Sequence, residues 1–212
     1  MARKEITLSQ NKLAKTELAI SDAELQALSE EIPTLALVRR FAHATTQVTW
    51  FSEVSRPLSG ETRDVAQRYL DTLGFPHVDI APLRDWIEAG DAAETHGFDT
   101  EQFEIEEQLR AGLSEMALAR MSEQALVIAL TYVTANAEPV LRARLEEQAE
   151  IWELADEEIL NAAAGAALLS AHNAALVLAA GADGNHPLAL KYHLFEIGRW
   201  PVSITGNSFN LF

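Results

Sequence analysis

Helix-starting and helix-ending residues alternate with apolar stretches along almost the whole chain. Ser21, Ser59, Asp99 and Ser122 stand where their side chains can cap a following helix. Gly74, with a proline two residues later, has the usual chemistry of a helix end. The pattern predicts about nine helices, at residues 21–33, 34–54, 59–73, 82–90, 99–120, 122–137, 138–155, 156–180 and 187–197.

Short links between these helices indicate an all-α fold. We expect a multi-helix bundle of about nine helices in a single domain that spans residues 1–212. The alanine-rich stretch 159–180 is predicted to be the central helix, around which the others pack. The longest break in the helical pattern, at 90–98, is where a seam would lie if the chain formed two subdomains.

The apolar stretch has a second interpretation, a membrane span. No charge occurs from Ile159 to Ala182, which is long enough to cross a bilayer. However, the run contains polar side chains such as Ser170, and its flanks are acidic without a Lys or Arg anchor. We therefore expect a buried helix and no membrane association. The first residues contain no signal-peptide core, so we expect a cytoplasmic protein.

The tail departs from the helical pattern. Polar and apolar residues alternate over 202–211 around Gly206, which suits the first position of a type II′ turn. In the resulting hairpin Ile204 opposes Phe209 and Val202 opposes Leu211. The alternative is an irregular tail that docks through its phenylalanines. A lone hairpin is marginal in water, so its apolar face is expected to lie on the helices or on a second subunit.

Composition removes several kinds of chemistry. The absence of cysteine excludes disulfides, zinc–thiolate sites, iron–sulfur clusters and thiol catalysis. The 32 acidic and 16 basic residues give a net charge of −16, so we expect no nucleic-acid partner, because phosphate contacts need clustered Lys and Arg. The acids concentrate in windows 85–107 and 146–158, which contain no base and are predicted to be largely solvated surface. We expect no metal and no cofactor.

Polar residues on the alanine-rich helix are the first candidate site. Asn161, Gly165 and His172 fall within about 60° of one another on a helical projection, and Asn173 lies further round. A glycine inside a helix costs about 1 kcal/mol relative to alanine, which indicates a close approach by another element at Gly165. The pattern predicts either a small polar pocket or a core histidine hydrogen-bonded to a neighbouring helix.

A second candidate lies on the last helix. His193 and Glu196 are one turn apart, on a helix whose remaining residues are mostly apolar or aromatic. Such a pair can transfer a proton or help to hold a metal. The alternative interpretation is an ordinary pair on a helix surface.

The segment around His172 also resembles a known family. The spacing Gly165-x-x-Leu168-x-x-x-His172, after an acidic helix start, is similar to the Cys-x-x-Cys-x-x-x-His helix of the alkylhydroperoxidase D and carboxymuconolactone decarboxylase group. The resemblance covers about 25 residues and implies an all-α, commonly oligomeric fold. Because Gly165 and Leu168 occupy the cysteine positions, it implies no thiol chemistry here, and only His172 carries over.

Three functions remain open. The first is a non-catalytic helical protein that forms a homodimer or binds another protein, because helices 159–180 and 187–197 and the aromatic tail offer surplus apolar surface. The second is a small-molecule-binding protein or enzyme with a pocket around His172. The third is an acidic decoy for a basic partner. No catalytic residue is assigned, and the pocket candidates are Asn161, Gly165, His172, Asn173, His193 and Glu196.

Overall fold

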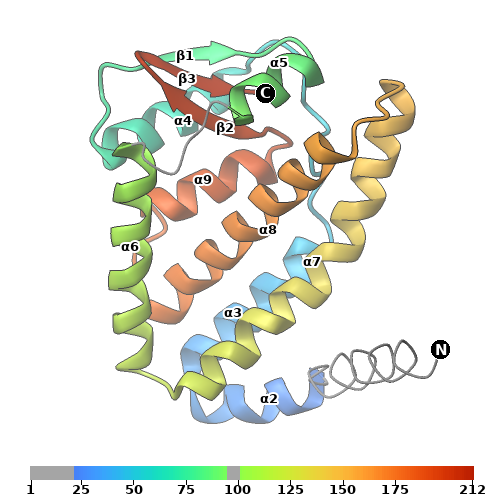
Figure 1. The fold of residues 1–212 in the computed structure, drawn as a ribbon. Coiled ribbons are helices and arrows are strands. Elements are labelled where there is room, and N and C mark those ends of the chain that lie inside the picture. Colours follow the sequence, from blue (N-terminus) through green and yellow to red (C-terminus); the bar gives the residue numbers. More distant parts are fainter. Residues whose placement is uncertain (1–21, 95–100) are drawn as a thin grey trace, which may run out of the picture.

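The computed structural model describes residues 22–94 and 101–212, and the chain is mostly helical, as expected from its sequence (Figure 1). The described part also contains one small three-stranded sheet. The helices are α2 (Asp22–Glu31), α3 (Pro33–Thr45), α4 (Gly60–Leu73), α5 (Trp86–Glu94), α6 (Glu101–Leu118), α7 (Glu123–Ile151), α8 (Glu157–Ala180) and α9 (Pro187–Glu196). The strands are β1 (Asp79–Pro82), β2 (Pro201–Thr205) and β3 (Ser208–Leu211).

The alanine-rich helix α8 begins and ends as its sequence predicts. Asp156 caps its start by accepting hydrogen bonds from the backbone N–H groups of Glu158 and Ile159. Gly181 ends it in the left-handed conformation, with φ of 63°. The helix packs against α3, α5, α6, α7 and α9. It is long and apolar enough to cross a membrane by length and composition, but 61% of its most apolar window is buried inside the protein.

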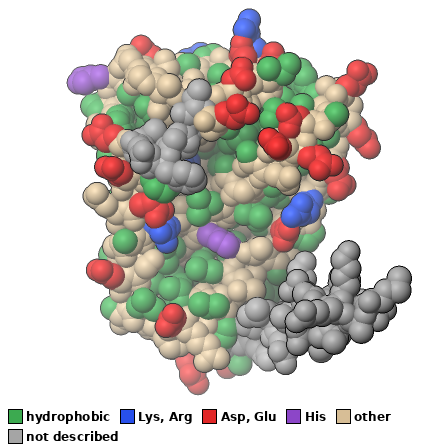
Figure 2. All heavy atoms as spheres, viewed as in Figure 1, with side chains coloured by type: hydrophobic (Ala, Val, Ile, Leu, Met, Phe, Trp, Pro, Cys, Tyr) green, Lys and Arg blue, Asp and Glu red, His purple; other side chains and the backbone are tan. Residues whose placement is uncertain are grey.

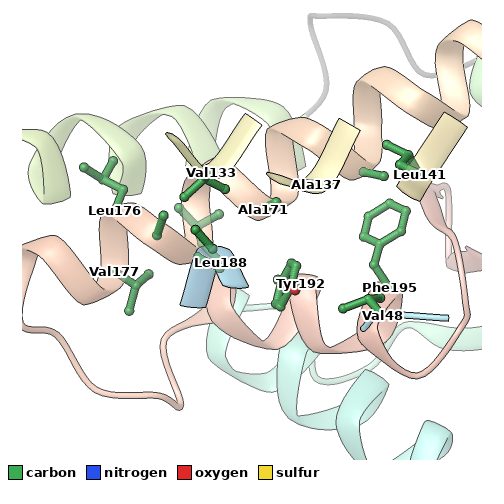
Figure 3. Close-up of a cluster of buried hydrophobic side chains, with 14 of the residues drawn as sticks. Val48, Val133, Ala137, Leu141, Ala171, Leu176, Val177, Leu188, Tyr192 and Phe195 are labelled. Carbon is green, nitrogen blue, oxygen red and sulfur yellow. The ribbon is translucent and has the colours of Figure 1, made fainter. Parts of the chain in front are cut away.

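A large part of the core forms where α7, α8 and α9 meet (Figure 3). Small side chains of α8, such as Ala171, let the larger side chains of the neighbouring helices come close. Val133 of α7 and Leu188 of α9 lie on either side of α8 residues in this cluster, and Phe195 fills the space towards Val48. Burial of this apolar surface is the main force that holds the helices together.

The C-terminal hairpin forms, and it belongs to a larger sheet. Ile204 pairs with Phe209 as expected, and Gly206 has a φ of 59°, as its place in the turn requires. The expected pairing of Val202 with Leu211 is wrong, because a bulge at that point places Pro201 opposite Leu211. The third strand, β1, was not expected from the sequence and runs parallel to β3, which gives the order β1-β3-β2.

This sheet covers a second apolar cluster. Ile204 and Phe209 are buried against side chains of α4 and α9, including Tyr69 and Leu194. The aromatic rings of Tyr69 and Phe209 lie with their centroids 5.4 Å apart. The apolar face of the hairpin is therefore covered within the chain. A lone hairpin is marginally stable in water, and packing on the helices is one of the two arrangements expected for it.

Several helix boundaries differ from the expected ones. The segment predicted as 34–54 is helical only to Thr45, because Thr45 and Thr46 donate their hydroxyl protons to backbone carbonyls at the helix end. The helix expected at 82–90 begins at Trp86, because Pro82 is the last residue of β1, and it runs through Gly90 to Glu94, so the expected break does not begin at Gly90. The expected starts at Ser21 and Asp99, and residues 95–98 of the expected seam, lie outside the described residues.

The expected break before Pro139 does not occur. Helix α7 runs through Pro139 without interruption. A proline has no N–H to donate to the carbonyl four residues earlier, here that of Ala135. Both residues are exposed, so solvent can bond to this carbonyl and the buried side of the helix keeps its hydrogen bonds.

Ser59 provides a direct test of the helix-capping assignments. Its hydroxyl accepts a hydrogen bond from the backbone N–H of Thr62 at 3.0 Å, at the start of α4. Replacing Ser59 with alanine is expected to lower the free energy of unfolding by about 1 kcal/mol, whereas Ser59→Asp keeps an acceptor and is expected to change it little. Urea unfolding followed by circular dichroism measures both. Equal losses in the two variants would contradict the capping role.

Candidate functional site

The predicted stripe of α8 does not line one common pocket, because Asn161 lines a cavity between α7 and α8 while Gly165 and His172 line none of the cavities described below. Asn161 and Gly165 are both exposed. A Cβ atom added to Gly165 would meet no atom of the described residues within 4 Å, so the expected close approach at this glycine is wrong. The reason is that this turn of α8 faces outward, which a helical projection of one segment cannot reveal.

His172 matches the alternative interpretation, a histidine bonded to a neighbouring helix. Its Nε2 is hydrogen-bonded to the hydroxyl of Thr134, on α7. Burial lowers the pKa of this imidazole below its ordinary value. The ring therefore joins two packed helices in its neutral form at pH 7, and it lines none of the cavities described below.

His193 and Glu196 form the expected pair on α9. His193 Nδ1 lies 2.7 Å from Glu196 Oε2, and both side chains are partly exposed. The hydrogen bond to Glu196 raises the pKa of His193. No group of three or more metal-ligating acids and histidines occurs in the described part of the chain. The structure thus shows a hydrogen-bonded pair at the surface of α9.

One predicted residue, Asn173, lines a cavity that the sequence did not reveal. The cavity has a volume of about 190 Å³ and lies between α6, α8, α9 and the start of β2. Leu169 at its rim is 52% exposed, so the cavity is accessible from the surface. The apolar part of its wall comes from Phe103, Ala166, Leu169, Pro201 and Val202, and the polar part from Glu106, Glu107, Ser170, Asn173 and Lys191.

A buried network of polar side chains supports one wall of the cavity. Lys191 Nζ of α9 lies 2.8 Å from both carboxylate oxygens of Glu106, on α6. Tyr69 donates its hydroxyl proton to Glu106 Oε1. Gln102 donates to the Tyr69 hydroxyl at 2.9 Å and accepts from the backbone N–H of Ile204 at 2.8 Å. The network therefore ties α4, α6, α9 and β2 together at the cavity.

The electrostatics of this network keep Glu106 charged. Burial by itself raises the pKa of Glu106, but the nearby ammonium of Lys191 and the hydrogen bonds from Lys191, Tyr69 and Gln102 outweigh it, so the pKa lies below its ordinary value. Burial, together with the charge of Glu106, raises the pKa of Tyr69 well above its usual range. At pH 7 the network thus holds one carboxylate, one ammonium and a neutral phenol.

Ser170 has the most unusual environment in the cavity wall. Its side chain is 2% exposed, and its Oγ has no hydrogen-bond partner among the residues that the structure describes. A buried hydroxyl without a partner costs about 1–3 kcal/mol. Seven described residues carry a buried side-chain atom of this kind, and Ser170 is the one among them that lines a described cavity. An unsatisfied hydroxyl in the wall of an accessible cavity is therefore a place where a bound molecule can supply the missing hydrogen bond.

Replacing Ser170 with alanine is expected to stabilise the free protein by about 0.5–2 kcal/mol, because it removes an unpaired buried hydroxyl and places a better helix former in α8. Ser203→Ala is the matched control, since Ser203 is equally buried but donates to the backbone carbonyl of Ala92 at 3.1 Å. This control is expected to lose about 1 kcal/mol. Urea unfolding compares the two, and a loss of stability in Ser170→Ala would contradict the assignment.

The sequence contained two signals for this site. Lys191 is the only lysine after residue 15, and it lies on a helix that is otherwise largely apolar. Gln102 and Glu106 are four residues apart, which places them on one face of a helix. Glu106, however, is part of the acidic window 85–107. Among so many acidic neighbours, the sequence alone does not distinguish it from a solvated surface carboxylate.

Two other cavities are less suited to bind a molecule specifically. One, of about 260 Å³, lies between α7 and α8 and includes Asn161 in its wall. The other, of about 460 Å³, lies along α6 and has a mainly apolar wall that includes Met116 and His186. None of the described residues that line them carries a buried polar atom without a partner.

Comparisons with known proteins do not indicate a function for this chain, so the candidate site depends on the geometry described above. No protein family, no curated protein and no solved structure significantly matches this chain. The resemblance of the segment around His172 to the alkylhydroperoxidase D group therefore gains no support.

Proposed function

We propose that this protein binds a small molecule in the cavity between α6, α8, α9 and β2. The observation that carries the proposal is the buried, unpartnered hydroxyl of Ser170 in the wall of that cavity. The proposal keeps the second function considered from the sequence, but moves the pocket from His172 to a neighbouring face of α8, where Asn173 lies.

The size and construction of the cavity support this proposal. Its volume of about 190 Å³ exceeds the roughly 150 Å³ of an engineered cavity that holds benzene, so it has room for about six to eight non-hydrogen atoms. Its wall combines apolar side chains with a few polar groups held in place, as small-molecule sites commonly do. The network of Glu106, Lys191 and Gln102 fixes these groups before any ligand arrives.

The test is to fill the cavity by mutation. Ala166 lines it, so the larger side chain in Ala166→Leu is expected to occupy the space. Ala162→Leu is the matched control, because Ala162 is exposed on the same helix and does not line this cavity. Four-carbon probes (butyramide, butyrate and butylammonium) are titrated into ¹⁵N-labelled protein while amide shifts are recorded by NMR.

The proposal predicts that at least one probe shifts the Ser170 and Asn173 amides in a saturable way. Ala166→Leu is expected to abolish this response, whereas Ala162→Leu retains it. No saturable response from any probe, or an equal response in both variants, would overturn the proposed function.

A second candidate function is self-association, which the exposed end of α7 favours. Ile151 and Trp152 are adjacent, and their side chains are 63% and 41% exposed. On the face in Figure 2, hydrophobic side chains gather in patches among acidic ones. Of the segments that first suggested association, α9 and the tail are in contrast largely covered within the chain, whereas α8 keeps Leu169 exposed. Sedimentation of the wild type and of Trp152→Glu tests this candidate: a monomer in both excludes it.

A further inference from the structure

The cavity of the proposed function also indicates which chemical class of ligand it takes. We infer that the ligand is an uncharged molecule of about six to eight non-hydrogen atoms, with a short apolar body and a head group that both donates and accepts hydrogen bonds, such as a primary amide or an alcohol. This inference rests on the proposed function.

The charges in the wall are balanced in pairs. The ammonium of Lys191 binds both oxygens of Glu106, and the second carboxylate of the wall, Glu107, pairs with Arg110. No other charged side chain lines the cavity in the described part of the chain. A charged ligand would therefore give up its hydration without gaining a counter-ion, and this cost disfavours carboxylates and amines.

The polar groups that remain suit a head group with both donor and acceptor atoms. The Ser170 hydroxyl can donate and accept, and the Asn173 side chain carries an amide N–H₂ and a carbonyl. An ammonium has three N–H groups, and Glu106 is the one hydrogen-bonding partner of Lys191 among the described residues. One N–H of Lys191 is thus free to meet a ligand carbonyl or hydroxyl oxygen.

The apolar part of the wall suits a short hydrocarbon body. Phe103, Leu169 and Val202 line the cavity together with Ala166 and Pro201. Burial of a methylene group contributes about 0.8 kcal/mol, so a chain of three carbons adds substantially to the affinity while the head group sets the orientation.

The experiment compares the affinities of butyramide, butyrate and butylammonium at pH 7, measured by the same NMR titration. These probes share a four-carbon skeleton and differ in the charge and hydrogen-bonding of the head group. We expect butyramide to bind at least tenfold more tightly than either charged probe. In Ser170→Ala the affinity for butyramide is expected to fall about fivefold, as the loss of one neutral hydrogen bond implies.

Ser114→Ala is the control for this variant, because Ser114 lies on α6 outside the cavity and its hydroxyl donates to the backbone carbonyl of Arg110. It should leave the affinity unchanged. Tighter binding of butyrate or butylammonium than of butyramide would overturn the inferred ligand class while the cavity remains a binding site. An unchanged butyramide affinity in Ser170→Ala would also overturn it. If none of the three probes binds, or if Ala166→Leu does not block the binding that is seen, the proposed function itself is overturned.

Discussion

Replacing Lys191 with methionine should lower the free energy of unfolding by about 3–5 kcal/mol at pH 7. Methionine has a similar length but no charge, so the carboxylate of Glu106 would remain buried without its counter-ion. The side chains of Lys191 and Glu106 are only 16% and 14% exposed, which limits the access of water to the remaining charge. Urea unfolding of the wild type and the variant measures the loss.

The pH dependence of this loss has a defined sign. In the wild type the pKa of Glu106 lies below its ordinary value, so its contribution to stability is present above that ordinary pKa and disappears as the pH falls through the lower, folded-state value. In Lys191→Met, burial of Glu106 is opposed only by hydrogen bonds, and its pKa rises. The difference in free energy of unfolding between the variant and the wild type is therefore expected to become smaller as the pH falls from 7 to 4.

Two further variants make this prediction specific. The double variant Lys191→Met/Glu106→Gln removes both charges, so we expect it to recover much of the stability that the single variant loses. Arg142→Met breaks the exposed pair with Glu138 and should cost no more than about 0.5 kcal/mol. Equal losses in Arg142→Met and Lys191→Met, or a Lys191→Met deficit that does not change with pH, would contradict the idea that Glu106 is held as a buried carboxylate.

The sequence predicted best those elements whose determinants are local. Helix α8 has an acidic cap at Asp156, a long uncharged and alanine-rich stretch and Gly181 at its end, and the cap and the glycine act within one or two helical turns. The hairpin turn at Gly206 is equally local. For these elements, the residues that decide the structure are neighbours along the chain.

The sequence could not predict features that depend on distant partners. Strand β1 has four residues and exists because β3, over 120 residues later, pairs with it. The candidate site has the same character: Glu106 and Lys191 are 85 residues apart, and only the packing of α6 beside α9 distinguishes this carboxylate from its solvated neighbours. Gly165 is the opposite case: the sequence predicted a close approach by another element at this glycine, but in the fold the residue is exposed.

Replacing Gly198 with alanine is expected to cost about 2–5 kcal/mol, the second large effect. Gly198 joins α9 to β2 and has a φ of 84°, in a region that costs an L-residue about 1–2 kcal/mol. An added Cβ would also lie 2.5 Å from Ser52 Oγ and 3.0 Å from the backbone nitrogen of Glu53. That nitrogen donates a hydrogen bond to the Gly198 carbonyl, so it cannot move away without loss.

Gly74→Ala separates the two causes. Gly74 has a comparable φ of 99°, but a Cβ there would meet no atom of the described chain within 4 Å. We therefore expect Gly74→Ala to lose only the conformational part, and Gly198→Ala to lose about 1–3 kcal/mol more, which is the steric part. Thermal and urea unfolding compare the two, and equal losses would show that the contact with Ser52 and Glu53 relaxes freely.

Gly198 links Lys191 on α9 to Val202 on β2, so a backbone shift there would also displace two walls of the cavity. Gly198→Ala should therefore weaken probe binding, whereas Gly74→Ala should not.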